Sequence, residues 1–361
     1  MRVAIYSELY PPHIGGMEMR LSQLAGVLRA RGHSVDVFCI GHDPALPADE
    51  VVDGVRVRRH PRVRRYRGSV IPGVPRNVSA VLRYALWARR TASAGDYDLH
   101  VFNQWPFAHV ALASAGVRRR AVVDWCEVRG GRVYGAFERW LPTRAARNTA
   151  VSPEVAAGIA LASGRAVDAV PTGVRIDQFH SDATRSGLLY VGRLFEHKRV
   201  PLLVEAFGQL RANGYDGTLT IAGDGDARPD VERAVAALDP AARTSVRVLG
   251  YIDDADKVRL LAAAAVLVIP SKREGFPITV TEAMASALPV VTTSDDGNGT
   301  ASVVRDYGIG LVASPTPPAL ADAIARVLDD WSAYSAKASE AAHTLDWDVL
   351  VEKFESMAVT R

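Results

Sequence analysis

The chain alternates between short apolar runs and longer amphipathic stretches from its amino end onward. Residues 3–7 form the first apolar run, and residues 34–40 form the second. Between them, apolar side chains in residues 17–31 recur every three or four positions, which is the spacing of one helix face. Gly32 follows this stretch and is a typical helix end. The pattern predicts a strand, a helix and a second strand.

The same alternation continues along the chain in two series. The first series predicts strands at 54–57, 99–102, 121–125, 149–152 and 167–170. The second predicts strands at 187–191, 218–222, 246–249, 266–269, 289–292 and 310–312. Apolar strands that alternate with helices are typical of parallel sheets covered on both faces. A polar stretch, 177–187, separates the two series. We therefore expect two doubly wound α/β domains, 1–179 and 180–340, joined by a hinge, with ligands bound in the cleft between them beyond the carboxyl ends of the strands.

Composition narrows the class of protein. Of the 361 residues, 48% are apolar and 23% are charged, which is typical of a globular chain and excludes wholesale disorder. Two cysteines, Cys39 and Cys126, cannot build a disulfide framework. The longest apolar run, 260–269, is about half of what a bilayer span requires. We expect a cytoplasmic protein that is neither exported nor transmembrane.

Charge is distributed unevenly. Residues 1–180 contain 25 Arg or Lys and 15 Asp or Glu, whereas the remainder contains 18 and 25. Two basic segments, Arg56–Arg67 and Arg83–Arg90, interleave arginines with aromatic residues. They favour attraction to an anionic membrane, at the inner face, or to a phosphorylated acceptor; the alternative is a solvated edge strand and loop. Charge alone permits nucleic-acid binding, but no recognition motif supports it.

Two short motifs are candidates for binding an anion. Gly15 and Gly16 precede the first helix, where a ligand can approach the backbone and the helix amino end favours negative charge; the alternative is a plain tight turn. Arg193 lies just beyond a predicted strand end, and Lys198 follows five residues later. Two such cations suit a diphosphate, and the alternative is a solvated basic turn.

The most informative stretch follows the apolar run 266–269. Pro277 suits the first turn of a helix, where the amides of Ile278 and Thr279 would point at a phosphate. Glu274 in the loop and Glu282 on the helix are separated by seven residues. Carboxylates accept hydrogen bonds from hydroxyl groups, so one could hold a sugar ring and the other a ribose.

These motifs together resemble a known family. The shared segments are Glu274-x7-Glu282 with Gly275-Phe276, Val191-Gly192-Arg193 with Lys198, Gly15-Gly16-Met17-Glu18, and Pro171-Thr172-Gly173-Val174. They resemble the family-4 group of retaining glycosyltransferases, also called glycosyl transferases group 1. The resemblance spans almost the whole chain and implies the GT-B fold, in which two Rossmann-like domains face a central cleft.

The resemblance implies a role for each domain. The first domain would bind the acceptor, with helix 341–361 packed back on it, and the second would bind a nucleotide-diphosphate sugar without metal. Arg193 and Lys198 would neutralise the diphosphate, Glu274 would hold the sugar and Glu282 the ribose. The donor-binding residues implied are Gly15, Gly16, Gly192, Arg193, Lys198, Tyr251, Glu274, Gly275, Phe276, Pro277, Ile278, Thr279 and Glu282. The acceptor-binding residues expected are His13, Asn103, Trp105, Glu127 and Arg129.

The sequence departs from the family at several positions, two of which lie next to the expected site of the donor sugar. Cys126 stands where many members have a histidine that faces the donor sugar, and Asn103 also replaces a frequent histidine. Our expected catalytic residues are Arg193, Lys198, Glu274 and Cys126, where Cys126 is either a packed thiol, a substitute for the histidine or a covalent nucleophile.

Three activities therefore stay open. The first is retaining transfer of a hexosyl unit to a hydroxyl of a glycolipid, an envelope polysaccharide or a secondary metabolite. The second is nucleotide-sugar 2-epimerisation, and the third is nucleotide-sugar binding with impaired catalysis.

Overall fold

The computed structural model describes residues 1–13, 15–63 and 77–359, and it divides the chain into two compact units. Unit 1 comprises Met1–Thr172 and Trp347–Arg361, and unit 2 comprises Gly173–Asp346. The sequence placed the divisions at 179/180 and 340/341. They fall elsewhere because Val174 N donates to Leu345 O over 2.9 Å and Val174 pairs with Asp346, so both connecting segments belong to unit 2.

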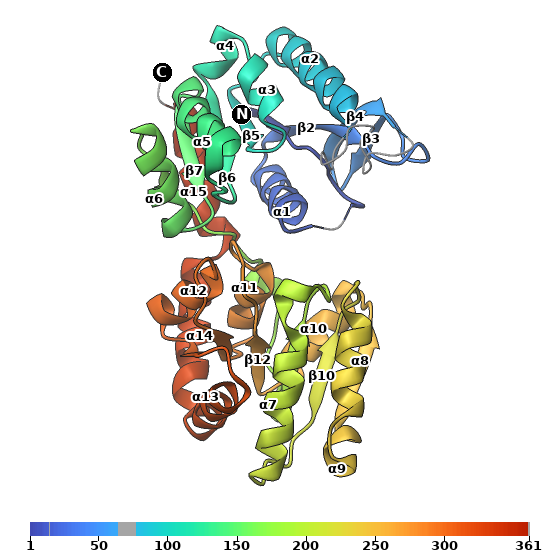
Figure 1. The fold of residues 1–361 in the computed structure, drawn as a ribbon. Coiled ribbons are helices and arrows are strands. Elements are labelled where there is room, and N and C mark those ends of the chain that lie inside the picture. The colour runs from blue at the N-terminus through green and yellow to red at the C-terminus, as the bar shows by residue number, and fades with distance from the viewer. Residues whose placement is uncertain (14, 64–76, 360–361) are drawn as a thin grey trace. The chain divides into compact units, whose positions relative to one another are not determined.

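Unit 1 is built on an eight-stranded sheet with the order β3-β4-β2-β1-β5-β6-β7-β8. Figure 1 labels most of its strands and helices. Its strands are β1 (Arg2–Tyr6), β2 (Ser34–Gly41), β3 (Asp49–Val52), β4 (Val55–Arg62), β5 (Leu99–Asn103), β6 (Ala121–Trp125), β7 (Arg147–Ala150) and β8 (Asp168–Ala169). Its helices are α1 (Gly16–Ala30), α2 (Val78–Ala94), α3 (Phe107–Leu112), α4 (Ala115–Arg118), α5 (Gly131–Trp140), η1 (Leu141–Arg144), α6 (Pro153–Ser163) and α15 (Trp347–Val359). Its strands pair in parallel, as the sequence predicts, except that the edge strand β3 is antiparallel to β4.

The last helix, α15, completes the core of unit 1. Trp347, Val351 and Phe354 are fully buried among the apolar residues of α1 and the sheet. Trp347 Nε1 also donates to Gln23 Oε1 over 3.0 Å. The chain therefore returns to its first unit through α15 alone, because α14 (Trp331–Thr344) packs in unit 2.

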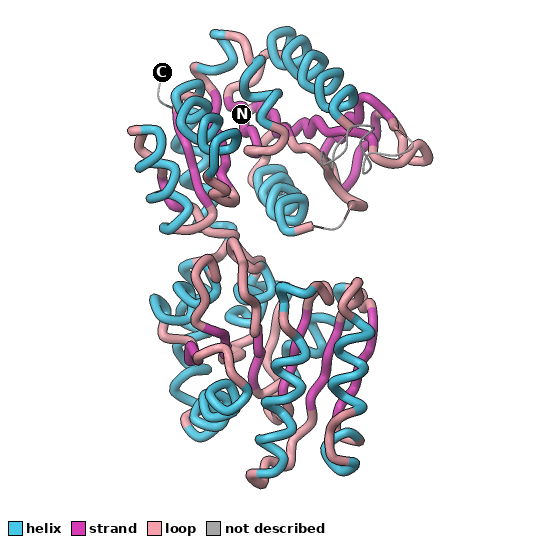
Figure 2. Tube along the Cα trace, in the orientation of Figure 1, coloured by secondary structure: helices cyan, strands magenta, loops and turns pink. Residues whose placement is uncertain are grey.

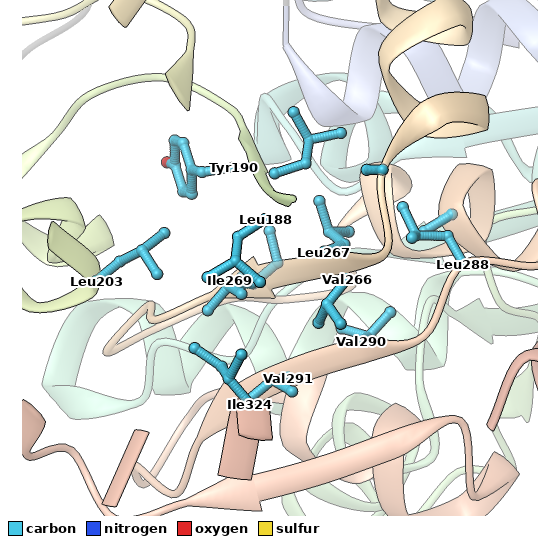
Figure 3. Packing of buried hydrophobic residues seen from close by; sticks show 14 of the residues in the cluster. Leu188, Tyr190, Leu203, Val266, Leu267, Ile269, Leu288, Val290, Val291 and Ile324 are labelled. Atoms are coloured by element: carbon cyan, nitrogen blue, oxygen red, sulfur yellow. The ribbon is translucent and has the colours of Figure 1, made fainter. Parts of the chain in front are cut away.

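Unit 2 has a six-stranded sheet, parallel throughout, with the order β11-β10-β9-β12-β13-β14. Figure 2 shows the strands of each unit in magenta and the helices in cyan. Its strands are β9 (Leu188–Val191), β10 (Leu219–Ala222), β11 (Val246–Gly250), β12 (Val266–Ile269), β13 (Val290–Thr293) and β14 (Gly310–Ala313). Its other elements are η2 (Ile176–Gln178), η3 (Glu196–Lys198), α7 (Val200–Ala212), α8 (Arg228–Ala236), α9 (Pro240–Arg243), α10 (Asp254–Ala263), α11 (Ile278–Ala285), α12 (Gly299–Tyr307) and α13 (Pro317–Asp329). Leu188, Leu267 and Val290 from three adjacent strands pack with Leu203 and Ile324 from helices (Figure 3), and this explains the continuous apolar runs in the sequence.

Each sheet has one point where the chain reverses its direction of strand addition. In unit 1 this point lies between β1 and β5, and in unit 2 it lies between β9 and β12. Ligands of open α/β sheets bind outside the carboxyl ends of the strands at such a point. The loops that follow these four strands are therefore the first places to look for a site.

Candidate functional site

Three loops of unit 2 are joined by backbone hydrogen bonds at the carboxyl ends of β9, β12 and β13. Lys272 N donates to His197 O over 2.8 Å, and Gly299 N donates to Glu274 O over 2.9 Å. A Cβ atom at Gly299 would lie 2.0 Å from Gly275 O, so only glycine permits this approach. The loops consequently hold Lys198 and Glu274 on one rigid surface.

Lys198 and Glu274 form an ion pair in this surface. Lys198 Nζ donates to Glu274 Oε1, which also accepts from Ser271 Oγ over 2.8 Å. Both side chains are largely buried. The sequence assigned the two residues to different parts of one ligand, and the structure places them in direct contact.

Arg193 lies in the same region but is exposed. Its guanidinium stacks over Phe195 at 4.8 Å from the ring centre. It forms no ion pair with any residue that the structure describes. A cation that is held by a ring rather than by a carboxylate keeps its charge available to an anion.

The loop after β12 ends at the amino end of α11. Pro277 directly precedes the first helical position, Ile278, in agreement with the prediction of a proline at or near the first turn. The amides of Ile278 and Thr279 lie in that first turn, where the helix itself offers no carbonyl partner. Phe276 is half-buried against the core of unit 2. The expected phosphate-binding turn therefore has the local structure that such a role requires.

Gly192 and Tyr251 lie at the ends of β9 and β11. Gly192 N donates to Ala222 O over 3.0 Å, and a Cβ atom at Gly223 would lie 1.9 Å from Gly192 O. Gly223 N donates to Gly250 O over 2.7 Å, and the next residue, Tyr251, is 70% exposed. These contacts join the loops after β9, β10 and β11, and they leave the Tyr251 ring open to a ligand.

Glu282 is buried and has a partner that the sequence did not reveal. Lys257 Nζ, from α10, donates to Glu282 Oε1 over 2.7 Å. Burial raises the pKa of Glu282, and the lysine opposes this rise. The sequence gives no indication of Lys257, because it is 25 positions from Glu282 and lies on a helix that carries no recognised motif.

Arg199 is a second residue that sequence reasoning missed. Its guanidinium donates to Pro270 O over 3.0 Å and to Thr293 Oγ1 over 3.0 Å, and it pairs with Asp295. These contacts connect Arg199, the residue after Lys198, to the carboxyl ends of β12 and β13. Arg199 also has a φ of 49°, which only a few non-glycine residues adopt.

In unit 1, the predicted Gly15-Gly16 motif begins α1. Gly15 precedes the helix, and a Cβ atom there would lie 2.2 Å from Glu18 Oε2. Glu18 is buried, and its Oε1 lies 3.5 Å from His13 Nδ1. An acidic side chain thus occupies the amino end of α1, where the helix dipole stabilises negative charge.

Asn103 and Cys126 meet at the carboxyl ends of β5 and β6. Asn103 Nδ2 lies 3.6 Å from Cys126 Sγ, and burial raises the pKa of the thiol. Gln104 Oε1 accepts from the amides of Cys126 and Glu127 over 2.6 and 3.0 Å. The thiol is therefore held neutral in a fixed loop, and Gln104, which carried no sequence signal, is what fixes the loop.

Trp105, Glu127 and Arg129 form one connected group. Glu127 Oε1 accepts from Trp105 Nε1 over 3.1 Å and from Arg129 Nε over 2.9 Å. The Arg129 guanidinium also lies 4.7 Å from the Trp105 ring centre and 5.3 Å from that of Tyr134. Of the five expected acceptor residues, Asn103 thus ends β5, Trp105, Glu127 and Arg129 lie on the loops that follow β5 and β6, and His13 lies on the loop after β1.

The Pro171–Val174 motif lies where unit 1 ends. Arg20 Nη1 donates to Pro171 O over 2.7 Å, and Arg20 Nη2 donates to Val170 O over 2.8 Å. The same guanidinium pairs with Asp124 at the end of β6. This motif is therefore held by α1 and by the central part of the first sheet.

Comparison with known proteins decides the family. Residues 14–178 match the family described as Glycosyltransferase Family 4, and residues 176–344 match Glycosyl transferases group 1. The chain is a family-4 glycosyltransferase. Its fold is GT-B, with two Rossmann-like units built on the sheets described above.

Known relatives resemble this glycosyltransferase over nearly its whole length. Glycogen synthase of Mycobacterium tuberculosis is 28% identical, covering 97% of this chain and 92% of the relative. Phosphatidyl-myo-inositol mannosyltransferase of the same species is 27% identical, covering 94% and 91%. The crystal structure of Anabaena Alr3699/HepE in complex with UDP superposes with a TM-score of 0.74 at 20% identity, covering 100% of both chains.

The acidic residues that could suggest a metal in this glycosyltransferase have other partners. Asp295 pairs with Arg199, while Asp224 pairs with Arg228 and accepts from Gly225 N. Among residues 1–13, 15–63 and 77–359, no three acidic, histidine or cysteine side chains gather as metal ligands would.

The two basic segments of the glycosyltransferase differ in their contacts. Arg59 is buried and binds Glu50, while Arg56 pairs with Asp49, so this part of the first segment serves internal contacts. Arg56 also lines a cavity of about 460 Å³ at the amino ends of β1 and β2. Residues 64–67 of that segment lie outside the described residues. Arg83, Arg89 and Arg90 are exposed on α2.

No helix in the described part of the chain combines the length and the apolar character needed to span a bilayer.

Proposed function

We propose that this glycosyltransferase moves a hexosyl unit from a nucleoside-diphosphate sugar to an acceptor hydroxyl with retention of configuration. The observation that carries the proposal is the cluster at the switch point of the second sheet. There, Arg193, Lys198 and the first turn of α11 offer positive charge and amide hydrogens, and Glu274 offers carboxylate oxygens. This combination fits a diphosphate joined to a sugar.

The reaction would proceed on one face of the sugar. The bond between the anomeric carbon and the diphosphate oxygen breaks, the acceptor oxygen bonds to that carbon, and the acceptor proton passes to the departing diphosphate. Arg193, Lys198 and the α11 amides would stabilise the charge that develops on the leaving group. No protein base is required, which agrees with a Cys126 thiol whose pKa burial raises.

The protein would need no metal, because two cations and a helix amino end already oppose the diphosphate charge. The complex of HepE with UDP supports a nucleotide donor, since that protein shares the fold. On the acceptor side we assign Asn103, Trp105, Glu127 and Arg129 in unit 1, where a carboxylate, a guanidinium and an indole lie within one hydrogen-bonded group. His13 beside Glu18 would complete this set.

The test is incubation of the purified protein with UDP-, GDP- and dTDP-sugars in excess chelator, with and without acceptors. Isothermal titration calorimetry reports binding, and mass spectrometry with NMR of the anomeric proton reports the product. Transfer with retention supports the proposal. A donor converted to its C2 epimer without acceptor would identify an epimerase, and binding without any turnover, hydrolysis included, would identify an impaired binding protein.

We further propose that the acceptor lies at the surface of an anionic membrane. Helix α2 would bind that surface. Val78, Leu82 and Leu86 are exposed at four-residue intervals along α2, which contains arginines but no acidic residue. A helix with an apolar stripe and basic flanks suits the interface of an anionic bilayer. Cosedimentation with phosphatidylglycerol vesicles should retain the wild type, and Leu82→Asp should release it. Equal binding to phosphatidylcholine vesicles, or equal binding of Leu82→Asp, would contradict this role.

A further inference from the structure

Lys257 and Glu282 form an enclosed pair of opposite charges in unit 2, on α10 and α11. Lys257 Nζ lies 2.7 Å from Glu282 Oε1 and 3.0 Å from Asp254 Oδ1. The side chains of Lys257 and Glu282 are 18% and 5% exposed, whereas that of Asp254 is 82% exposed. The lysine thus joins a buried carboxylate to a carboxylate at the surface.

Removing such a cation changes the state of the buried acid. A carboxyl group without water or a counter-charge takes up a proton rather than staying ionised. Burial raises the pKa of Glu282, and Lys257 is the largest influence in the opposite direction. An ionised carboxylate accepts hydrogen bonds at both oxygens, whereas the protonated group also presents an O–H donor. The lysine therefore decides which hydrogen bonds Glu282 can make.

Glu282 lies about one helical turn beyond the amino end of α11. Ile278 is the first residue of the helix, and Glu282 follows four positions later. Residues at this spacing lie on the same helix face, one turn apart. A nucleotide whose phosphates rest on the first turn has its ribose only a few bonds away, within reach of that next turn.

We propose that Lys257 is a positioning residue for recognition of the donor's ribose: it keeps Glu282 ionised and fixes its orientation so that the carboxylate accepts from the ribose hydroxyls. The inference rests on the proposed function, because it takes the donor to be a nucleotide bound at α11. It deepens that function by naming the residue on which the ionisation and orientation of Glu282 depend, so any preference for a ribonucleotide over a nucleotide that lacks these hydroxyls should depend on Lys257.

The experiment measures the affinities of UDP and 2′,3′-dideoxy-UDP by calorimetry, and repeats them with GDP and its dideoxy counterpart. The proteins are wild type, Lys257→Met, Lys257→Arg, Glu282→Gln, the double variant Lys257→Met/Glu282→Gln and the matched control Lys337→Met. Lys337 is an exposed lysine on α14 in the same unit. Since hydrogen bonds to a charged group are worth about 10–100-fold in affinity, the wild type should prefer the ribonucleotide by that factor.

We expect Lys257→Met to lower this preference at least about tenfold by weakening ribonucleotide binding alone. Lys257→Arg should restore part of it, and Lys337→Met should change neither affinity. The double variant should be no worse than Glu282→Gln, because both changes remove the same interaction. In Lys257→Met the preference should rise as the pH increases, since the carboxyl then ionises. Both nucleotides carry the same diphosphate, so titration of the phosphates does not change the ratio of the two affinities.

Three outcomes would overturn the inference, and they are distinguishable. Equal losses for both nucleotides in Lys257→Met would show that the lysine serves the fold or the phosphates. A wild type that binds both nucleotides equally would show that Glu282 does not read the ribose. A wild type that binds neither UDP nor GDP would remove the proposed function itself.

Discussion

The Arg20 guanidinium forms a two-point ion pair with the Asp124 carboxylate inside unit 1. Nε and Oδ2 are 2.8 Å apart, Nη2 and Oδ1 are 3.1 Å apart, and the two side chains are 1% and 0% exposed. Asp124 also accepts from Thr149 Oγ1 over 2.8 Å. The pair thereby connects α1 to β6 and β7, and the remaining donors of Arg20 reach the last residues of the unit.

Breaking this pair should destabilise the protein strongly. Arg20→Leu or Asp124→Asn leaves a buried group without its partner, and removal of one partner of a buried pair costs about 3–5 kcal/mol. Guanidinium unfolding followed by tryptophan fluorescence measures the change. The exposed pair Arg233–Asp230 is the control, and Arg233→Ala should cost less than about 1 kcal/mol. Equal effects of the two changes would refute this interpretation.

Gly299 should tolerate no side chain. Its missing Cβ would lie 2.0 Å from Gly275 O, a backbone atom that cannot rotate away. We expect Gly299→Ala to lower the free energy of unfolding by about 1–3 kcal/mol and to weaken nucleotide binding, because the loops around Glu274 must separate. Gly26→Ala in α1 has nothing within 4 Å and should stabilise by about 0.5–1 kcal/mol. Thermal unfolding and calorimetry test both, and an unchanged Gly299→Ala protein would contradict the packing argument.

His100 and His109 should make unit 1 sensitive to acid. Burial lowers the pKa of each ring to about 4, whereas an unfolded histidine titrates near 6.5. The folded state binds its protons less tightly, so stability is constant above about pH 6.5 and falls as the pH drops towards 4. Each ring should account for about 2–3 kcal/mol by pH 4.5.

The measurement is urea unfolding between pH 7.5 and 4.5 for wild type and His109→Gln. The pH-dependent loss should be smaller in the variant, because its side chain does not titrate. His180→Asn, which changes an exposed histidine, is the control and should follow the wild type. A variant whose stability falls with pH as steeply as that of the wild type would exclude His109 as a source.

Regular features of this fold could be predicted from the sequence because they depend on local patterns. The apolar run 266–269 coincides with β12, and the periodic stretch 17–31 differs from α1 by one residue at each end. By contrast, β3 has only four residues, one of them half-buried and the rest exposed, so no apolar run marks it. The boundary between the units differs from the predicted one because a β-bridge between Val174 and Asp346 joins segments far apart in the sequence.

The candidate site also contains some residues that local sequence patterns indicate and others that depend on contacts distant in sequence. The sequence singled out Arg193, Lys198, Glu274 and the start of α11 because they occur in motifs of fixed spacing next to strand ends. Lys257 and Gln104 were not found, since each acts through a partner more than 20 positions away. Residues that support a site from a distant part of the sequence can be recognised only in the three-dimensional structure.

The central claim is that the residues at the switch point of the second sheet stabilise a departing diphosphate. Its most direct test is the turnover rate of the donor found by screening, measured for Arg193→Ala, Lys198→Ala and Cys126→Ala, with circular dichroism as the check on folding. Loss of one electrostatic stabiliser typically lowers the rate by about 10²–10³, which we predict for Arg193→Ala and for Lys198→Ala. Cys126→Ala should change the rate by less than about tenfold. If Cys126→Ala abolished turnover while Lys198→Ala stayed near the wild-type rate, a thiol-dependent mechanism would replace the one proposed.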